Sequence, residues 1–389
     1  MEKWEAFSAY LPMRRAAKAE PGRRKRGRRM RRTISLLLAL ALGLLGCLSS
    51  AAADPTVIEP NMELTLSDEV IQGLAKSNPE EEGVDPLTGL PMGDEPYTPI
   101  VLVLDDSPEV FPHWGVAEAD WIVQVPLRRD GDTRMLAVYG SQYPEQAGGA
   151  RSARMTMLPV AAMFKSAVAF VGYPPNTEYD IMVSAWLDEW DFNKPIRYFD
   201  LLGKRYRERV DFLEAPQNMS AHINEIHQNL VKRNVKFEKR FFRFADEPET
   251  RGDDAANIQM HFFGCEETTE ESIPSACSFA YTEGTGYLRD SSTGIYSDRN
   301  TGEAIPFANV IVLRSKLNWI GYYPYYEDHL RYFGQAEIFM NGKHISGAWY
   351  RRGRLARLVL LDEEGNEIAL QRGKTFMVIG DQYTVVSYE

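Results

Sequence analysis

The chain has 389 residues, of which 44% are hydrophobic and 25% are charged, and its formal net charge is −11. This composition is that of a globular protein and excludes collagen-like, disulfide-dense and wholly disordered chains. The charge is unevenly distributed, because residues 1–46 carry 12 Lys/Arg and 3 Asp/Glu while residues 47–389 carry 32 and 52, a balance of −20. So acidic a body disfavours nucleic-acid binding, which depends on counterion release by Lys and Arg.

The N-terminus has the pattern of a secretory leader. Met30-Arg31-Arg32 is followed by an apolar run over 34–45, which is shorter than the roughly 20 residues of a membrane-spanning helix. Leu44-Leu45-Gly46-Cys47 then resembles the bacterial lipobox, in which cleavage before the cysteine leaves that cysteine carrying lipid. We therefore predict a leader over 1–46, with residues 1–29 an incorrectly assigned start, and lipidation of Cys47. A signal-anchor helix with a buried cysteine is the alternative.

A lipidated Cys47 would hold the rest of the chain at the extracytoplasmic face of the cell membrane. Residues 47–84 are predicted to be a flexible tether, since they combine low hydrophobicity with the acidic run Glu80-Glu81-Glu82. Within this tether only the stretch 62–74 has the pattern of a short helix.

The first globular region, over 85–245, mixes predicted strands and helices and indicates an α/β domain within an α+β chain. A continuous apolar run indicates a strand buried on both faces, and two further runs joined by a polar turn indicate a hairpin. Helical spacing marks two helices, the second capped by Ser220. In chain order, these elements are a strand over 100–104, a hairpin over 119–125 and 134–140, and helices over 153–168 and 220–233.

The second globular region, over 257–389, is predicted to be mainly antiparallel β. An acidic, loop-like stretch over 245–257 sets the predicted domain boundary. Beyond it, short alternating runs follow one another, and Asn341-Gly342 between two of them is a strong hairpin signal. Cys265 and Cys277 can form a disulfide in an extracytoplasmic protein, and two separate thiols are the alternative.

Ordered motifs along the chain resemble those of the YerB-like lipoprotein family, which carries domain of unknown function 3048. The motifs of the first region are Asp85-Pro86-Leu87-Thr88-Gly89-Leu90-Pro91, Ala119-Asp120, Thr133-Arg134 and Gly149-Ala150-Arg151-Ser152-Ala153-Arg154. The motifs of the second region are Thr301-Gly302-Glu303, Asn309-Val310-Ile311-Val312, Asn341-Gly342-Lys343 and Gly347-Ala348-Trp349.

This resemblance implies a lipid-anchored, two-domain envelope protein of Gram-positive-type bacteria with no established activity. The sequence departs from the family pattern at Gln124, where glutamate is usual, and at Pro216-Gln217-Asn218, where Pro-His-Asn is usual. If these polar positions form a site, the departures imply a modified one.

The candidate ligand-binding residues are basic. Arg151, Ser152 and Arg154 are predicted to lie at a helix start, where free N–H groups and the helix dipole favour an anion and Ser152 can act as the cap. With Arg134 and Asp120 they would form a site for a carboxylate or phosphate. The alternative is a structural network in which Arg151 and Arg154 pair with Asp120 or another carboxylate.

Other candidate groups carry less weight. His222 and His227 are five residues apart, about 140° around a helix, so we interpret them as surface side chains and predict no metal site. The aromatic and acidic stretch 186–191 and the tyrosine-rich stretch 322–326 are interpreted mainly as packing.

The chain has no nucleophile elbow, P-loop or dinucleotide fingerprint. We therefore predict a non-catalytic envelope lipoprotein that needs no cofactor and binds an envelope protein or a wall polymer. The alternative is an enzyme that acts on cell-wall or other extracellular polymers, using Asp120 with the arginines.

Overall fold

The structure is a computed structural model of the chain. It describes residues 54–74, 78–127, 131–173, 183–185, 187–188, 197–262, 276–316, 318–320, 323–325 and 330–389. Cys47 and the leader therefore lie outside the described residues. Within this part of the chain, residues from Ala53 onward belong to one compact unit.

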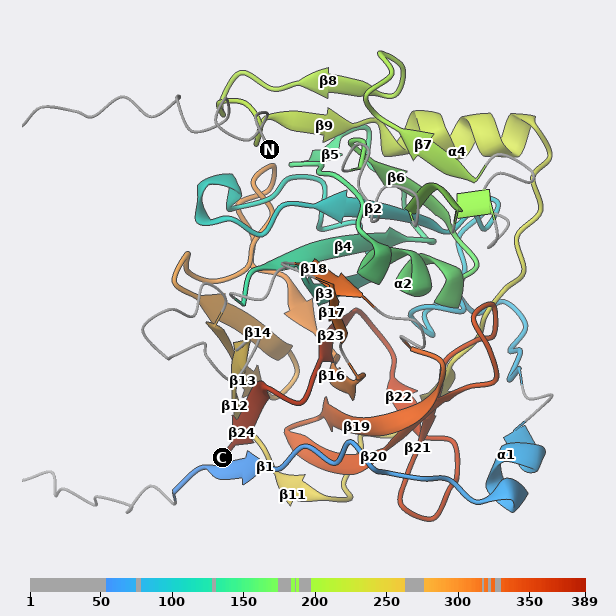
Figure 1. Ribbon diagram of the computed structural model, residues 1–389, viewed down its shortest axis with the longest axis vertical. Helices are drawn as coiled ribbons and strands as arrows, with labels where there is room; N and C mark the ends of the chain where they lie inside the picture. The colour runs from blue at the N-terminus through green and yellow to red at the C-terminus, as the bar shows by residue number, and fades with distance from the viewer. Residues whose placement is uncertain are drawn as a thin grey trace, which may run out of the picture. The chain divides into compact units, whose positions relative to one another are not determined.

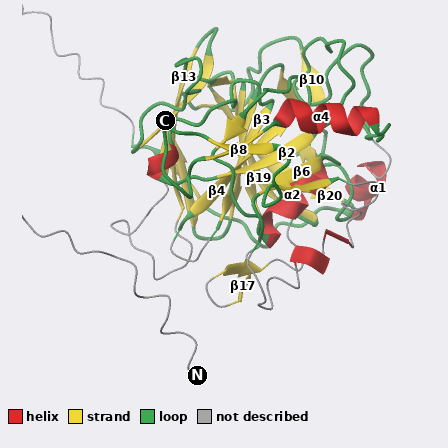
Figure 2. Ribbon diagram, turned by 90° about the horizontal axis from the view of Figure 1, so that it is seen from above, coloured by secondary structure: helices red, strands yellow, loops and turns green. Residues whose placement is uncertain are grey.

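The described residues are mostly β-strands with few helices, which confirms the predicted α+β class (Figures 1 and 2). The largest sheet has eleven strands in the order β11-β20-β19-β16-β23-β3-β4-β2-β6-β7, with β21 pairing to β20. Their bounds are β2 Ile100–Leu104, β3 Trp121–Pro126, β4 Thr133–Tyr139, β6 Ala167–Phe170, β7 Tyr198–Asp200, β11 Asp253–Asp254, β16 Asn309–Arg314, β19 Tyr332–Met340, β20 Lys343–Arg351, β21 Val359–Leu361 and β23 Thr375–Gly380.

A six-stranded antiparallel sheet has the order β1-β24-β12-β13-β14-β15. Its strands are β1 Thr56–Ile58, β12 Asn257–Phe262, β13 Ala276–Thr282, β14 Gly286–Ser291, β15 Pro306–Phe307 and β24 Thr384–Tyr388. The smaller sheets contain β5 Ala147–Gly148, β8 Arg207–Arg209 and β9 Met219–Ala221, then β10 Arg243–Ala245 with β22 Ala369–Gln371, and β17 Asn318–Ile320 with β18 Tyr323–Tyr325.

The large sheet is buried on both faces. Every residue of β2 is buried, as its continuous apolar run predicts, and alternate side chains enter two separate cores. One core includes α2 (Leu158–Met163), and the other includes α4 (Ile223–Lys232) and the six-stranded sheet. Figure 1 shows α2 and α4 on either side of β2 and β6.

The predicted hairpins are confirmed. β3 and β4 pair antiparallel with Trp121 opposite Val138, and β19 and β20 are joined at Asn341-Gly342. Both turn residues have positive φ, 52° and 70°, which is the backbone that an Asn-Gly hairpin turn requires.

Both predicted helices are shorter than expected. The stretch over 153–168 contains a 3₁₀ turn, Met155–Met157, then the six residues of α2, and its last residues already belong to β6. The second helix begins at Ile223 rather than at Ser220, which lies on β9 and accepts a hydrogen bond from Trp114 Nε1 at 3.0 Å. Packing against the sheet edge thus overrides the capping signal at Ser220.

The tether is also shorter than the sequence predicts. β1 pairs with β24, and α1 (Asp68–Leu74) follows close behind it. Val70 and Ile71 of α1 pack, together with Leu64 and Leu66, on a small core that includes Tyr350. Apolar side chains spaced along an otherwise polar stretch therefore attach it to the protein.

The large sheet crosses the predicted boundary at 245–257. β23, from the second region, pairs parallel with β3, from the first, with Met377 opposite Val123. β10 and β22 make a second parallel pairing between the two regions. The two regions therefore share one hydrogen-bonded sheet. The limits of two separate domains remain a prediction from the sequence.

Candidate functional site

Several strands of the large sheet end at one edge. β3 and β2 run in the same direction because both are antiparallel to β4, and β6 is parallel to β2. Asp105 and Asp106 directly follow β2 at this edge. Ligands of sheets with parallel strands commonly bind outside the carboxyl ends of those strands, so this edge is a favourable place for a site.

Arg151 is fixed at this edge by its own main chain. Its N–H donates to the Val103 carbonyl at 2.9 Å, and its carbonyl accepts a hydrogen bond from Val171 N–H at 2.8 Å. The segment thus lies between the ends of β2 and β6. The Arg151 side chain, 24% exposed, places Nε 2.8 Å from Asp105 Oδ2. This ion pair is the contact expected from the alternative interpretation, a structural network, and the carboxylate in it is Asp105.

Two further arginines contact the same segment. Arg134 on β4 is 5% exposed, and its Nη1 donates to the Ser152 carbonyl at 3.4 Å. Arg154 Nη1 donates to the Ala153 carbonyl at 2.8 Å. The structure therefore brings together Arg134, Arg151, Ser152 and Arg154, which we call the arginine cluster.

The helix-start geometry predicted for this cluster is wrong. Residues 150–153 are extended along the ends of β2 and β6, and the following 3₁₀ turn begins only at Met155. Ser152 is therefore not a helix cap, and α2, with six residues, begins at Leu158. Any affinity of the cluster for anions must come from its guanidinium groups, without a helix dipole.

Asp120 does not belong to the arginine cluster. It precedes β3 at the opposite end of the β3–β4 hairpin, since Arg134 pairs with Val125 near the other end of that strand. Asp120 Oδ2 accepts hydrogen bonds from the N–H groups of Gly140 at 2.6 Å and Ser141 at 3.0 Å. Burial, reinforced by the nearby Asp85 carboxylate, raises the pKa of Asp120 to about 7.

Asp106 points to the other face of the sheet. Its Oδ2 accepts hydrogen bonds from Gln124 Nε2 at 2.8 Å and from the Thr133 hydroxyl. Burial raises the pKa of the Asp106 carboxyl above its ordinary value. Sequence reasoning did not single out Asp105 or Asp106. The signal that it missed is a pair of acidic residues directly after a fully buried strand.

Both departures from the family pattern lie around this turn. Gln124 contacts Asp106, as described. Gln217 lies beside Gly149, where a Cβ atom would come within 2.4 Å of the Gln217 carbonyl oxygen. The Gly149 carbonyl in turn accepts a hydrogen bond from the Asp105 N–H at 2.9 Å.

The two histidines differ from the prediction in one respect. His222 precedes α4 and lies near Glu208 and Glu225. His227 is buried rather than on the surface, and its ring stacks on Tyr143 with 3.7 Å between centroids. Over the described ranges, no group of three or more His, Cys, Asp or Glu side chains could hold a metal ion.

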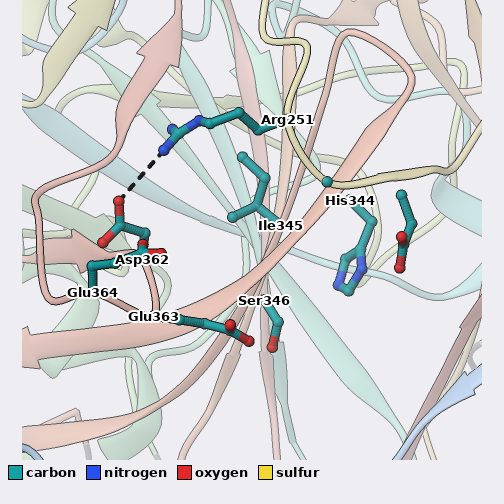
Figure 3. A pocket seen from close by; sticks show the side chains of 9 residues that line it. Arg251, His344, Ile345, Ser346, Asp362, Glu363 and Glu364 are labelled. Carbon is teal, nitrogen blue, oxygen red and sulfur yellow. Dashed lines mark hydrogen bonds and ion pairs between the residues drawn. The ribbon is translucent and has the colours of Figure 1, made fainter.

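An acidic pocket lies beside β20, with a volume of about 300 Å³ (Figure 3). Arg251 bridges this pocket to Asp362 at 3.5 Å and also pairs with Glu249 at 2.9 Å. His344, at its rim, lies 2.6 Å from the buried Glu337 carboxylate. The charge of this lining is opposite to that of the arginine cluster. Its arginine is engaged in ion pairs, and its histidine hydrogen-bonds Glu337.

The remaining predicted groups lie largely outside the described residues. Cys277 is buried on β13, and burial raises the pKa of its thiol. Its predicted partner Cys265 is not described, so the disulfide remains a prediction. Trp186 and Trp190 also lie outside the described residues, as does Tyr322. None of the helices in the described part is long and apolar enough to cross a membrane.

Comparison with known proteins gives two matching family models. The N-terminal domain model of "Protein of unknown function (DUF3048)" matches residues 87–236, and the corresponding C-terminal domain model matches residues 271–377. A curated relative, "Putative lipoprotein YerB" of Bacillus subtilis (strain 168), is 22% identical over 302 residues, covering 76% of this chain and 85% of the relative.

The fold is also similar to a solved structure. The crystal structure of YerB protein from Bacillus subtilis superposes with a TM-score of 0.62 at 22% sequence identity, covering 76% of this chain and 96% of the solved chain. At 22% sequence identity this similarity shows a common fold and nothing beyond it.

Proposed function

Because the chain belongs to the DUF3048 family, for which no activity is established, we propose that it is a non-catalytic binding protein of the cell envelope. In this proposal Cys47 carries the lipid anchor, and the arginine cluster binds an anionic group of an envelope protein or wall polymer.

The lipid anchor is supported by the lipobox-like sequence and by the curated relative that is named a lipoprotein. Nine residue steps separate Cys47 from Thr56 in β1. Fully extended, they span at most about 30 Å, since each residue adds roughly 3.3–3.6 Å. Anchoring at Cys47 would therefore keep the protein close to the membrane and give it access to envelope components there.

The observation that carries the binding proposal is the placement of Arg151. Hydrogen bonds on both sides of its main chain fix it at the sheet edge, while its side chain remains partly exposed beside Arg134 and Arg154. A guanidinium held in this way offers several N–H donors in one plane, which matches carboxylate and phosphate groups. In a body with a balance of −20, a local cluster of arginines is a surface on which an anion meets favourable charge.

The test uses the full-length lipoprotein purified from membranes in detergent, mixed with an anionic wall polymer of the teichoic acid type. We expect the wild-type protein to co-sediment with the polymer. The Arg151→Ala variant should bind the polymer with at least ten-fold lower affinity. Arg233→Ala, which removes the same charge from an exposed helix end, is the matched control.

Two results would contradict the proposal. Equal retention of Arg151→Ala and Arg233→Ala would show that the arginine cluster is not the contact surface. Chemical turnover of the polymer without stoichiometric retention would instead support the enzyme alternative. Circular dichroism of both variants checks that loss of binding is not loss of folding.

A further inference from the structure

The acidic pocket beside β20 lies at an interruption in the edge of the large sheet. On its outer side β20 pairs with β11 as far as His344, and with β21 from Ala348 onward. Within the described part of the chain, no strand pairs with the outer side of Ile345, Ser346 and Gly347. The pocket, with a volume of about 300 Å³, is lined by Ile345 and Ser346 and therefore opens at this interruption.

The alternation of hydrogen bonds directs the main chain of Ser346 into the interruption. Met340 and Lys343 face each other across a two-residue turn, so they form a hydrogen-bonded pair. Every second residue of β20 from Lys343 therefore bonds to β19, and the residues between them bond outward. The outward carbonyl of Gly342, which accepts from Ala255 N–H at 2.8 Å, agrees with this pattern. The Ser346 carbonyl thus points outward between β11 and β21.

His344 presents an acceptor nitrogen to the same pocket. Its ring centroid lies 4.4 Å from that of Tyr388 and 4.9 Å from that of Phe339, and the residue is only 7% exposed. Nε2 lies 2.6 Å from the Glu337 carboxylate, so in the neutral ring Nε2 carries the hydrogen and Nδ1 is an acceptor. Nδ1 has no hydrogen-bond partner among the described residues, and the ring lines the pocket.

Three further side chains gather around His344. Asp253 is opposite His344 in the β11–β20 pair, and Ser346 is two residues farther along β20, so all three share one face. The Tyr388 hydroxyl donates to Asp253 Oδ2 at 3.0 Å and orients this carboxylate. In Figure 3 the Glu363 side chain reaches toward Ser346. We call Asp253, His344, Ser346 and Glu363 the acceptor site.

Two basic residues beside the pocket are engaged elsewhere. Arg251 pairs with two carboxylates, as described above, and Lys343 Nζ lies 2.7 Å from Asp254. The Asp253 and Glu363 carboxylates have no ion-pair partner among the described residues. The acceptor site therefore combines negative charge with an unmatched imidazole nitrogen.

We propose that the acceptor site binds a primary ammonium group at the end of an alkyl chain. The three N–H groups of the ammonium would donate to His344 Nδ1, to an oxygen of Ser346 and to the Glu363 or Asp253 carboxylate. Ile345, which also lines the pocket, offers an apolar contact to the chain. A lysine side chain of a polypeptide and a free alkylamine both carry this group.

The arrangement of the acceptors favours an ammonium over other cations. A metal ion needs its ligands within about 2.0–2.6 Å, and no group of three His, Cys, Asp or Glu side chains over the described ranges could hold one. A guanidinium offers a planar fork that matches the paired oxygens of one carboxylate. The acceptors here come from separate side chains, which suits a compact charge with three N–H donors.

The experiment uses the full-length protein in detergent at low ionic strength, with butylammonium as the probe. Ligand-observed NMR and thermal shift measure binding. We expect a Kd on the order of 1 mM, as befits so small a ligand. Tetramethylammonium keeps the charge without N–H donors, and N-butylacetamide keeps the chain without the charge, so both should bind at least ten-fold more weakly.

Three results on the unmodified protein would overturn the proposal. Butylammonium fails to bind, tetramethylammonium binds equally well, or an equimolar amount of Ca²⁺ displaces butylammonium. Two further probes distinguish the sources of the ammonium. Tighter binding of Nα-acetyl-lysine methylamide than of 1,5-diaminopentane identifies a lysine side chain of a polypeptide, and the reverse order identifies a free amine.

Variants provide an independent test. The double variant Asp253→Asn, Glu363→Gln keeps the shape of two exposed side chains and removes their charge, so butylammonium should bind at least ten-fold more weakly. The double variant Asp211→Asn, Glu214→Gln makes the same exchange at exposed positions elsewhere and should bind as wild type does.

Circular dichroism checks that both double variants are folded. Unchanged binding by the folded Asp253→Asn, Glu363→Gln variant would overturn the proposal. Arg151→Ala should leave butylammonium binding unchanged, which separates the acceptor site from the arginine cluster and keeps the two proposals independent.

Discussion

Asp105 and Asp106 are neighbours in sequence and serve opposite faces of one sheet. Asp105 pairs with Arg151 at 2.8 Å, whereas Asp106 accepts a hydrogen bond from Gln124 at 2.8 Å on the other face. Successive side chains of an extended strand point to opposite faces, so this division continues the alternation of β2 beyond its last residue. One turn thus contributes a carboxylate to each face of the sheet.

The sharing of the large sheet predicts cooperative unfolding. Met377 on β23 is fully buried and lies opposite Val123 on β3, across the boundary between the two family segments. Met377→Ala should lower the free energy of unfolding by about 2–5 kcal/mol. Calorimetry should show one transition that shifts as a whole, since the mutation weakens a sheet common to both segments.

The exposed Val385→Ala is the control and should shift the transition little. Two separate calorimetric transitions, only one of which shifts in Met377→Ala, would mean that the two segments unfold independently, as the predicted boundary at 245–257 implies.

Arg351 is expected to be the most sensitive structural arginine among those described. It is fully buried, and it donates to the carbonyls of Pro159 at 3.2 Å and Leu330 at 3.0 Å. Burial lowers its pKa to about 9, so it remains charged at neutral pH. Arg351→Ala leaves buried carbonyls without donors and should cost at least about 3 kcal/mol. Chemical denaturation measures the loss, with the exposed neighbour Arg352→Ala as the control.

The anchor gives a prediction about location. Cys47→Ser removes the thiol that would be acylated, so the protein should lose incorporation of radiolabelled palmitate in a Gram-positive host. Wild-type protein should partition into the detergent phase of a Triton X-114 extract, and the processed body of the variant into the aqueous phase. Cys277→Ser, which removes a buried thiol, should leave the labelling intact. Undiminished labelling of Cys47→Ser would contradict the lipobox interpretation.

The sequence predicts the sheet better than the site. The apolar run over 100–104 and the Asn341-Gly342 turn contain local signals that the fold retains. The arginines were identified because charged residues are conspicuous next to apolar runs. Their true partner was missed, because pairing of Arg151 with Asp105 depends on a segment inserted between two strand ends, a contact that no local pattern encodes.

Asp120 was misassigned because its distance from Arg134 follows from the register of the β3–β4 hairpin. Long-range packing, rather than local propensity, therefore determines which residues meet at the arginine cluster.

Asp120 predicts a pH dependence of stability. Its pKa is about 7 in the folded protein against an ordinary value of 3.8, so the folded state binds this proton more tightly. The resulting stabilisation is present below about pH 4 and is lost as pH rises through 7. His113 acts in the opposite direction, because burial lowers its pKa to about 4. The contribution of Asp120 is therefore measured as the difference in stability between the wild-type protein and an Asp120 variant.

The variant Asp120→Asn keeps an acceptor for Gly140 and does not titrate. Relative to wild type, it should become more stable as pH rises from 5 to 8 in thermal unfolding scans. Asp211→Asn, at an exposed carboxylate, should keep a constant difference. A constant difference for Asp120→Asn would show that this carboxyl has an ordinary pKa in the folded protein.

Gln124→Glu tests how the site tolerates a second carboxylate. Gln124 is fully buried and donates to Asp106, so the variant places two carboxyl groups within hydrogen-bonding distance. Two carboxylates in one buried site cannot both ionise without a large penalty, and their pKa values rise. When the pKa of a group is higher in the folded than in the unfolded state, the folded protein becomes less stable as pH increases. The variant should therefore melt several degrees below wild type at pH 8. The difference in melting temperature should narrow at pH 5, where one shared proton restores the hydrogen bond.

Gln228→Glu, the same change on the exposed side of α4, is the control and should show neither effect. A deficit that is equal at both pH values would mean that the glutamate is accommodated without sharing a proton with Asp106.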